Sequence, residues 1–442
     1  MSFFGTDGIR GQVGNEPMTA DFILRLASAV AQVLVPNGGQ VLIGKDTRIS
    51  GYMVESALEA GFVAAGINVY LTGPLPTPGI AFLTKNLGAD LGITISASHN
   101  PYYDNGIKFF DKNGEKLSSH IEKEIESYLD NQPLTKSSKN LGRTIHRGGD
   151  RRKYQDFCKS TISSDIDFSS LKIVVDGANG AAYKVLPRVI SELGAEVIPI
   201  GCSPNGRNIN EGCGSTSPDL LKLTVKGVKA DAGIALDGDG DRLIMVDNLG
   251  QVVDGDRLLF ILAKDRHERG LLRGPVVGTV MNNLGLEKSL NNMGIAFHRA
   301  DVGDRNVLKM LMEVNGNLGG EPSGHLIDLD KLTTGDGLLS SLQILEIMFR
   351  NGLSLNDLSS EMLSLPQVLL NIDSKDSFDP FSSAKINDEF NRLSKELGST
   401  GRIVLRRSGT ENLIRLMVEG EDQAKITETA DILAEVILEN AK

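Results

Sequence analysis

Three carboxylates at alternate positions form the strongest chemical signal in the chain. An apolar, strand-like run leads directly into Asp237, Asp239 and Asp241, which are separated by glycines. The glycines let the backbone fold tightly around an ion, and hard oxygen ligands suit Mg²⁺, which takes its remaining ligands from phosphate and water. The structural alternative is a calcium loop, which has glycine after the third acid and glutamate at its twelfth position. Those positions hold Arg242 and Asn248, so we predict a magnesium loop.

A serine follows a second strand-like run. Residues 91–95 are mostly apolar and β-branched, and the loop after them contains Ser98 and His99. Because open α/β sheets place ligand chemistry at the carboxyl ends of strands, Ser98 is a candidate nucleophile. For an isolated serine the alternative is a turn or cap. The sequence has no G-x-S-x-G elbow, so hydrolase chemistry of that type has little support.

A glycine-rich loop further along carries three different polar groups. Glu321, Ser323 and His325 stand at alternate positions, which places a carboxylate, a hydroxyl and an imidazole in one loop. This arrangement suits recognition of sugar hydroxyls, because each hydroxyl can both donate and accept a hydrogen bond. Taken alone, the same residues are also compatible with a surface turn.

A second polar loop follows a predicted strand near the C-terminal end. Amides around Gly409, the hydroxyls of Ser408 and Thr410, and the guanidiniums of Arg406 and Arg415 would form a nest for an anion. The alternative is a polar hairpin turn.

Two more cations lie in glycine-rich turns. Arg10 lies in residues 4–11 and Lys108 in residues 106–108, and neither indicates a function alone. Together, the chain offers a hydroxyl acceptor, a divalent-metal loop, a polyol loop and an anion nest. This combination fits phosphoryl transfer, in which the protein mainly positions groups and neutralises charge.

The elements that must position these loops follow a repeated pattern. In residues 40–70, 171–198 and 274–297, a buried-strand run is followed by a helical stretch, a glycine and another apolar run. This is a βαβ unit, which favours a parallel or mixed sheet with right-handed crossovers. The last segment differs, with a helix expected over 381–397, strands over 401–405 and 414–418, and a helix over 421–440.

We therefore predict an α/β fold with three related mixed-sheet α/β domains and a smaller C-terminal α+β domain around a central cleft. A stretch rich in Ser, Gly and basic residues at 131–153 predicts a first linker, and composition changes again near 365–367. The expected domains carry the serine loop, the metal loop, the sugar loop and the phosphate loop in that order. Their predicted bounds are 1–150, 151–250, 251–365 and 366–442.

Bulk composition narrows the class of protein. A net charge of −11 over 442 residues argues against a nucleic-acid-binding surface, because counterion release needs a basic face. The three cysteines lack a disulfide or metal-knuckle pattern, so we expect reduced thiols. The start lacks a signal-type apolar run, and no later stretch approaches a membrane span. We expect a cytoplasmic protein that binds a small molecule, without nucleic-acid or membrane partners.

With these residues in place, the chain resembles the α-phosphohexomutase family from end to end. Four motifs of that family occur in its order, namely SASHNP, DGDGDR, GEPSGH and R-x-SGTE. The opening FGTDGIRG, and TTGDG after GEPSGH, resemble the branch that acts on glucosamine phosphates. The resemblance implies an isomerase that interconverts glucosamine 6-phosphate and glucosamine 1-phosphate through a phosphoserine enzyme and a bisphosphate intermediate. It also implies Mg²⁺, a sugar bisphosphate as activator and a homodimer.

The resemblance further implies a role for each motif residue. The implied sets are Ser98 with Asp237, Asp239 and Asp241 for Mg²⁺; Glu321 and Ser323 for sugar hydroxyls; Arg406, Ser408, Gly409, Thr410 and Arg415 for the phosphate that does not react; and Arg10, Lys108 and Arg242 as cations or acid/base groups at the transferred phosphate. His99 is expected to orient the serine loop. Ser98 is expected to be the residue that is phosphorylated.

Two positions depart from the family pattern. Arg407 and Asn412 stand where the family often has proline. Without those two φ restraints, the phosphate loop is expected to be more mobile when empty. Arg407 would either add a phosphate contact or point into solvent.

Three alternative functions stay open at this point. The first is a mutase for glucose or mannose phosphates with the same machinery, because no residue of the GEPSGH loop distinguishes a 2-amino group from a hydroxyl. The second is a Mg²⁺-dependent sugar phosphatase, in which water intercepts the phosphoserine. The third is a non-catalytic sugar-phosphate-binding protein on the same fold.

Overall fold

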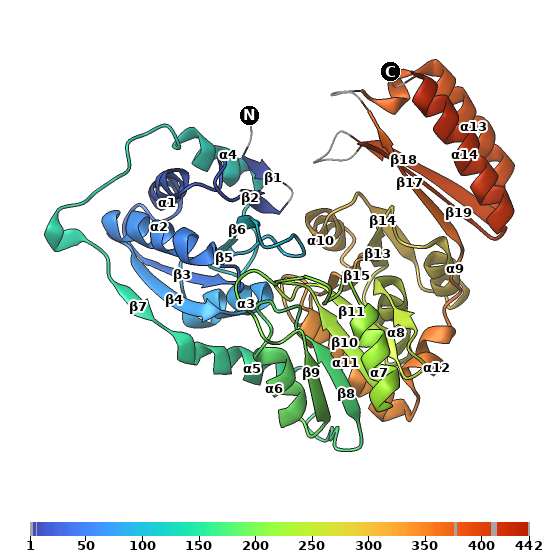
Figure 1. The fold of residues 1–442 in the computed structure, drawn as a ribbon, viewed down its shortest axis with the longest axis horizontal. Coiled ribbons are helices and arrows are strands. Elements are labelled where there is room, and N and C mark those ends of the chain that lie inside the picture. The colour runs from blue at the N-terminus through green and yellow to red at the C-terminus, as the bar shows by residue number, and fades with distance from the viewer. Residues whose placement is uncertain (1–2, 6, 375–377, 408–412, 441–442) are drawn as a thin grey trace.

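The structure is a computed structural model that describes residues 3–5, 7–374, 378–407 and 413–440 (Figure 1). Over these residues the strands form four sheets that follow one another along the chain. The first three sheets are mixed and the fourth is antiparallel. The structure thus confirms the predicted succession of three α/β domains and a smaller α+β domain, which we number I to IV.

Domain I is built on a seven-stranded sheet. In spatial order its strands are β1 (Phe4–Gly5), β2 (Gly8–Gln12), β6 (Asp104–Asp111), β5 (Leu91–Ile95), β3 (Gln40–Lys45), β4 (Asn68–Pro74) and β7 (Thr144–His146). Its helices are α1 (Ala20–Leu34), α2 (Gly51–Ala64), α3 (Thr77–Leu87) and α4 (Ser119–Ser127).

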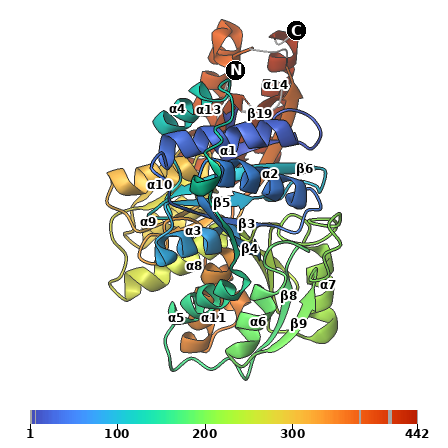
Figure 2. The same cartoon turned by 90° about the vertical axis from the view of Figure 1, so that its left-hand side faces the viewer.

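Side-chain alternation along the strands sets the two faces of this sheet. Val41 and Ile43 of β3 pack in a cluster with α1 and α2, which lie side by side (Figures 1 and 2). Leu42, between them, joins a second cluster that contains Ile80 of α3. That second cluster continues into domains II and III, so the first three domains share one hydrophobic core.

Domains II and III each carry a smaller mixed sheet. In domain II the spatial order is β12 (Val252–Val253), β11 (Leu243–Asp247), β10 (Ala232–Leu236), β8 (Lys172–Asp176) and β9 (Glu196–Ile200), with α5 (Arg151–Ser160), α6 (Val185–Glu192) and α7 (Asp219–Val228). In domain III it is β14 (Phe297–Ala300), β13 (Val276–Thr279), β15 (Leu318–Gly320) and β16 (Leu326–Asp328), with α8 (Gly255–Glu268), α9 (Leu284–Asn292), α10 (Asp304–Glu313), α11 (Gly337–Asn351) and α12 (Leu355–Ser360).

The three predicted βαβ units are confirmed. The strand pairs β3 with β4, β8 with β9 and β13 with β14 are all parallel, and α2, α6 and α9 connect them. A glycine follows each helix at Gly66, Gly194 and Gly294, and all three have positive φ. Glycine suits these positions because a left-handed residue that ends a helix is strained if it carries a Cβ.

Domain IV is a three-stranded antiparallel sheet with two long helices. Its spatial order is β17 (Gln367–Asp373), β19 (Leu413–Gly420) and β18 (Gly401–Arg407), and its helices are α13 (Ala384–Leu397) and α14 (Gln423–Asn440). The helices and two strands match the sequence prediction, whereas β17 was missed. Single 3₁₀ turns occupy Ser138–Asn140, Gly148–Asp150, Pro380–Ser382 and Gly398–Thr400.

Domain IV has its own hydrophobic cluster and stands beside α9, apart from domain I (Figure 1). The junction with domain III is polar. The buried Glu419 of β19 accepts a hydrogen bond from the Leu284 amide at 3.1 Å, and Arg402 donates to the Asn282 carbonyl at 2.7 Å.

Within the described residues, no helix combines the length and apolarity needed to cross a membrane.

Candidate active site

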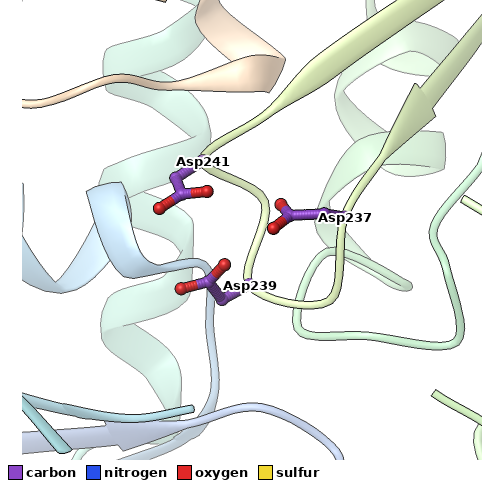
Figure 3. Close-up of side chains that lie close together, drawn as sticks. All are labelled: Asp237, Asp239 and Asp241. Atoms are coloured by element: carbon purple, nitrogen blue, oxygen red, sulfur yellow. The ribbon is translucent and has the colours of Figure 1, made fainter. Parts of the chain in front are cut away.

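The three aspartates converge in the loop between β10 and β11. Strand β10 ends at Leu236, and the carboxylates of Asp237, Asp239 and Asp241 each place an oxygen within 4.8 Å of the others (Figure 3). All three side chains are buried. A Cβ on Gly238 would lie 2.5 Å from the Ser98 carbonyl oxygen. Glycine is therefore needed there for the serine loop to approach.

This loop fits a cation. The Oδ1 atoms of Asp239 and Asp241 are buried and have no hydrogen-bond partner among the described residues. Burial, with the charges of Asp241 and Asp239, raises the pKa of Asp237 well above its ordinary value. Such crowding of carboxylates is relieved when a divalent cation takes the free oxygens as ligands. The donor set, all oxygen, is the type that hard cations prefer.

The predicted serine lies against this triad. Ser98 is buried, and its Oγ donates a hydrogen bond to Asp237 Oδ2 at 2.5 Å. Its φ of 53° places it in the left-handed region, which is strained for a residue with a Cβ. The Nδ1 atom of His99 lies 3.4 Å from Ser98 Oγ. Burial, together with Arg242 and Arg10, lowers the pKa of His99 to about 4, so the ring is neutral near pH 7.

Lys108 connects domain I to the triad. Its Nζ lies 2.8 Å from Asp239 Oδ2, 3.2 Å from Asp241 Oδ2 and 2.9 Å from Asp7 Oδ2. Although burial alone would lower it, these carboxylates hold the pKa of Lys108 well above its ordinary value. Asp7 was missed as a site residue, although it lies in the FGTDGIRG opening whose arginine was singled out.

The charges continue into domain III through residues that the sequence analysis did not connect. Lys116 lies 2.5 Å from Asp7 Oδ1 and forms an ion pair with Asp304. His325 Nε2 lies 3.5 Å from Asp304, and His325 Nδ1 lies 3.8 Å from Asp241. With Lys108, these groups close a ring in which cationic and acidic side chains alternate, which we call the charge ring (Asp7, Lys108, Asp241, His325, Asp304 and Lys116).

The place of His325 in the charge ring bears on its predicted role. The imidazole is buried and faces two carboxylates of the charge ring. Although burial alone would lower it, Asp241 and Asp304 raise the pKa of His325. Its role as a ligand of sugar hydroxyls stays a prediction, and the structure gives it a direct electrostatic link to the triad.

The other predicted residues of the first three domains surround the same place. Arg10 Nη2 lies 2.5 Å from Asp7 Oδ2, and the Arg242 amide donates to Asp237 at 3.2 Å. Glu321 accepts a hydrogen bond from the Gly303 amide at 3.1 Å, and Ser323 is exposed at the tip of the same loop. The Leu243 amide donates to the Gly324 carbonyl at 2.9 Å, so the glycine-rich loop of domain III packs directly on the metal loop.

In domain IV, two guanidiniums meet on neighbouring strands. Arg406 of β18 and Arg415 of β19 are directly opposed in the register. Burial, together with the like charge of Arg415, lowers the pKa of Arg406, because both disfavour the protonated guanidinium. Arg407 is exposed. The predicted loop residues Ser408, Gly409, Thr410 and Asn412 lie outside the described residues.

Comparison with protein families covers all four domains. Family models of phosphoglucomutase/phosphomannomutase match residues 1–136 as alpha/beta/alpha domain I, 152–250 as domain II, 254–365 as domain III and 369–436 as the C-terminal domain. The chain belongs to this family. The structure agrees with the match, because each of the four matched segments contains most of the strands of one of the four sheets, and three of them bring their loops to the aspartate triad.

Relatives and solved structures agree with this membership. A curated relative from Photorhabdus laumondii subsp. laumondii, described as phosphoglucosamine mutase, is 53% identical over 98% of each chain. A phosphoglucomutase/phosphomannomutase family protein from Burkholderia thailandensis has a similar fold, with a TM-score of 0.82, 24% identity and coverage of 98% of this chain and 96% of its own. An N-acetylphosphoglucosamine mutase from Aspergillus fumigatus, solved with GlcNAc-6P and magnesium, has a TM-score of 0.67 and 17% identity over 100% of this chain and 96% of its own.

Proposed function

We propose that this family member is a phosphoglucosamine mutase, which interconverts glucosamine 6-phosphate and glucosamine 1-phosphate. The observation that carries the proposal is the buried contact between Ser98 Oγ and Asp237 within the aspartate triad. A serine held at a cation site can carry a phosphoryl group whose charge the cation neutralises. Full-length similarity to a relative of that description supports the choice of sugar.

We assign Asp237, Asp239 and Asp241 as the residues that hold Mg²⁺, with an oxygen of phosphorylated Ser98 beside them. When bound, Mg²⁺ neutralises charge on the transferring phosphoryl group. Lys108 already contacts the Oδ2 atoms of Asp239 and Asp241, which leaves their buried Oδ1 atoms for the cation. Lys108 therefore orients the carboxylates and supplies a second positive charge at the site.

In the forward direction, phosphorylated Ser98 gives its phosphoryl group to the 1-hydroxyl of glucosamine 6-phosphate. The bond from phosphorus to Ser98 Oγ breaks, a bond to the sugar oxygen forms, the hydroxyl gives up its proton and the serine oxygen gains one. Arg10 and Arg242 stabilise the transferring group. The bisphosphate then reorients within the site, and its 6-phosphate returns to Ser98, which leaves glucosamine 1-phosphate.

The reorientation of the bisphosphate requires one subsite that accepts either of its phosphates. We assign it to Arg406 and Arg415 with Ser408, Gly409 and Thr410, and the sugar hydroxyls to Glu321, Ser323 and His325. The neighbouring guanidiniums of Arg406 and Arg415, opposed in the register of β18 and β19, are suited to this purpose, because both can donate charge-assisted hydrogen bonds to one phosphate. Closure of domain IV would also exclude water, which would otherwise hydrolyse the phosphoserine.

The test is kcat/KM for the 1-phosphates of glucosamine, glucose and mannose, with Mg²⁺ and a trace of the matching bisphosphate as activator. We expect glucosamine 1-phosphate to be preferred by about two orders of magnitude, a difference of about 2.7 kcal/mol. Equal or faster turnover of glucose or mannose phosphate would contradict the sugar assignment and retain the mutase chemistry. Release of free phosphate at the mutase rate would indicate a phosphatase. A Ser98→Ala variant with full activity would contradict the phosphoserine mechanism.

The homodimer and the cytoplasmic location also belong to this proposal. The first rests on the family resemblance, and the second is the expectation drawn from the composition of the sequence. Sedimentation equilibrium of the purified protein tests the first, and cell fractionation tests the second.

A further inference from the structure

The backbone amide and carbonyl of Ser98 are both bound by polar side chains that the proposed chemistry does not use. Its amide donates to Ser96 Oγ at 3.0 Å, and Ser96 Oγ donates in turn to Asp46 Oδ2 at 2.5 Å. Its carbonyl accepts from Arg48 Nη2 at 3.3 Å and from Asn210 Nδ2 at 2.9 Å. Both polar groups of this left-handed residue are therefore satisfied by side chains, which offsets the strain of its φ of 53°.

Arg48 is the centre of this arrangement in domain I. Its side chain has no exposed surface, and it pairs with the equally buried Asp46 at 2.6 Å. Other donors of Arg48 bind backbone carbonyls, at 2.8 Å for Asp104 at the start of β6 and 2.5 Å for Asn100 of the serine loop. A planar guanidinium can satisfy several carbonyls at fixed angles. The loop after β5 is thus attached to a rigid, fully buried ion pair.

Asn210, which lies in domain II, binds the same serine loop of domain I. Its Nδ2 donates to the carbonyls of Ser98 at 2.9 Å and Asn100 at 3.0 Å, which are two carbonyls that Arg48 also binds. These two acceptors determine the orientation of the amide, since the opposite orientation would point an oxygen at both carbonyls. Because Asn210 and Asp237 lie in the same domain, this contact sets the position of the serine loop relative to the triad.

We propose that Arg48 and Asn210 are positioning residues for phosphoryl transfer, which together clamp the carbonyls of Ser98 and Asn100 and so hold Ser98 Oγ against Asp237. This inference rests on the proposed phosphoserine function and adds to it the device that sets the serine. Neither side chain touches the reacting atoms. Their effect is on geometry, and misplacing a reacting group by about 1 Å can cost about 100-fold in rate.

The decisive variant is Asn210→Gly. Asn210 has a φ of 59°, which glycine adopts without strain, so the backbone conformation is retained while both hydrogen bonds to the serine loop are lost. We expect kcat to fall about 10- to 100-fold, KM to change less than about twofold, and the thermal midpoint to stay near that of the wild type. The matched control is Asn208→Ala. Among the described residues, its side chain bonds only within its own loop, to Asn205 and Ser203, and we expect an unchanged kcat.

A second readout does not depend on the choice of sugar. The full-length enzyme is dephosphorylated and mixed with glucose 1,6-bisphosphate and Mg²⁺, and the rate of phosphorylation of Ser98 is followed by quenched-flow mass spectrometry. Asn210→Gly should slow this single step by the same factor as kcat. An Arg48→Lys variant, which retains the charge beside Asp46 but cannot bind three carbonyls, should slow it as well.

Folded Asn210→Gly protein that is phosphorylated as fast as the wild type would overturn the inference, as would a loss of stability with unchanged kcat. Failure of the proposed function gives results that differ from failure of this inference. If the wild type itself takes no phosphate at Ser98, both proposals fall. If it takes phosphate but prefers another sugar, only the sugar assignment falls and the clamp is still measured.

Discussion

Replacing Lys108 with methionine removes the ammonium group that contacts both Asp239 and Asp241. The side chain is almost fully buried, and its Nζ also lies 2.9 Å from Asp7. Methionine keeps much of the volume and loses the charge, so the change isolates electrostatics from packing. The buried carboxylates of Asp239 and Asp241 and the partly buried Asp7 are left without this partner.

The magnitude follows from the three distances. At about 3 Å and an effective dielectric constant of about 20, each contact is worth roughly 5 kcal/mol before the desolvation of the ammonium is subtracted. Breaking a buried pair by removing one partner typically costs about 3–5 kcal/mol net. Without Mg²⁺ we expect the variant to be destabilised by this amount. Because one positive charge beside the cation site is gone, we expect Mg²⁺ to bind at least about tenfold more tightly, which is about 1.4 kcal/mol.

The assay combines calorimetric titration of the unphosphorylated enzyme with Mg²⁺ and thermal unfolding with and without the ion. The variant should unfold at a lower temperature than the wild type without Mg²⁺, and saturating Mg²⁺ should narrow that difference. Lys116→Met is the matched control, because it removes the same charge from the charge ring but contacts Asp7 and Asp304 rather than the triad. Its Mg²⁺ affinity should change less than about threefold, since the lost charge lies further from the cation.

Two results would refute this reasoning. If Lys108→Met binds Mg²⁺ no more tightly than the wild type, the ammonium is not coupled to a cation at these carboxylates. If Lys116→Met changes the affinity equally, the effect comes from the net charge of the region and not from the contact with Asp239 and Asp241.

Three further predictions concern other parts of the chain. Because the pKa of His99 is lowered to about 4, its NMR titration midpoint should lie near that pH. Histidine in the unfolded chain titrates at about pH 6.5, so the free energy of unfolding should rise with pH between these two values. The rise should be smaller in His99→Gln. Arg406→Gln should raise KM for the sugar phosphate at least about tenfold with a smaller effect on kcat, since a charge-assisted bond to phosphate is lost, whereas the exposed Arg407→Gln should change KM less than about threefold. Glu419→Ala leaves the Leu284 amide and Arg402 without their carboxylate partner and should weaken the attachment of domain IV by about 3 kcal/mol, seen as faster proteolysis near residues 365–367.

Much of the fold could be predicted because the relevant signals are local. Each βαβ unit is encoded in about thirty residues, as an apolar run, a helical stretch, a glycine and a second apolar run, and the structure confirms all three. Strand β17 was missed because exposed and partly buried residues alternate along most of it. Among the described strands it is an edge strand that pairs with β19 alone, so its existence depends on a partner forty or more residues away.

The acidic loop could be predicted equally well, because Asp237, Asp239 and Asp241 stand at alternate positions of one short segment and their spacing alone predicts one cluster. The charge ring could not be predicted from the sequence. Lys116 is 109 residues from Asp7 and 188 from Asp304, and no spacing rule connects residues so far apart. The FGTDGIRG motif contains Asp7, so the available signal was the motif itself and not any pattern of charges.

By itself, the sequence determined the local chemistry of this protein, namely which loops carry a serine, an acidic triad and pairs of guanidiniums, because short-range spacing sets what one loop can hold. The tertiary structure decided which of these loops meet. It placed Ser98 on Asp237, turned His325 toward Asp241 and Asp304, and brought Asn210 to the serine loop. Apart from the contact between His325 and Asp304, these contacts cross domain boundaries. Their geometry depends on how the shared hydrophobic core of domains I to III packs, which no segment of the chain specifies alone.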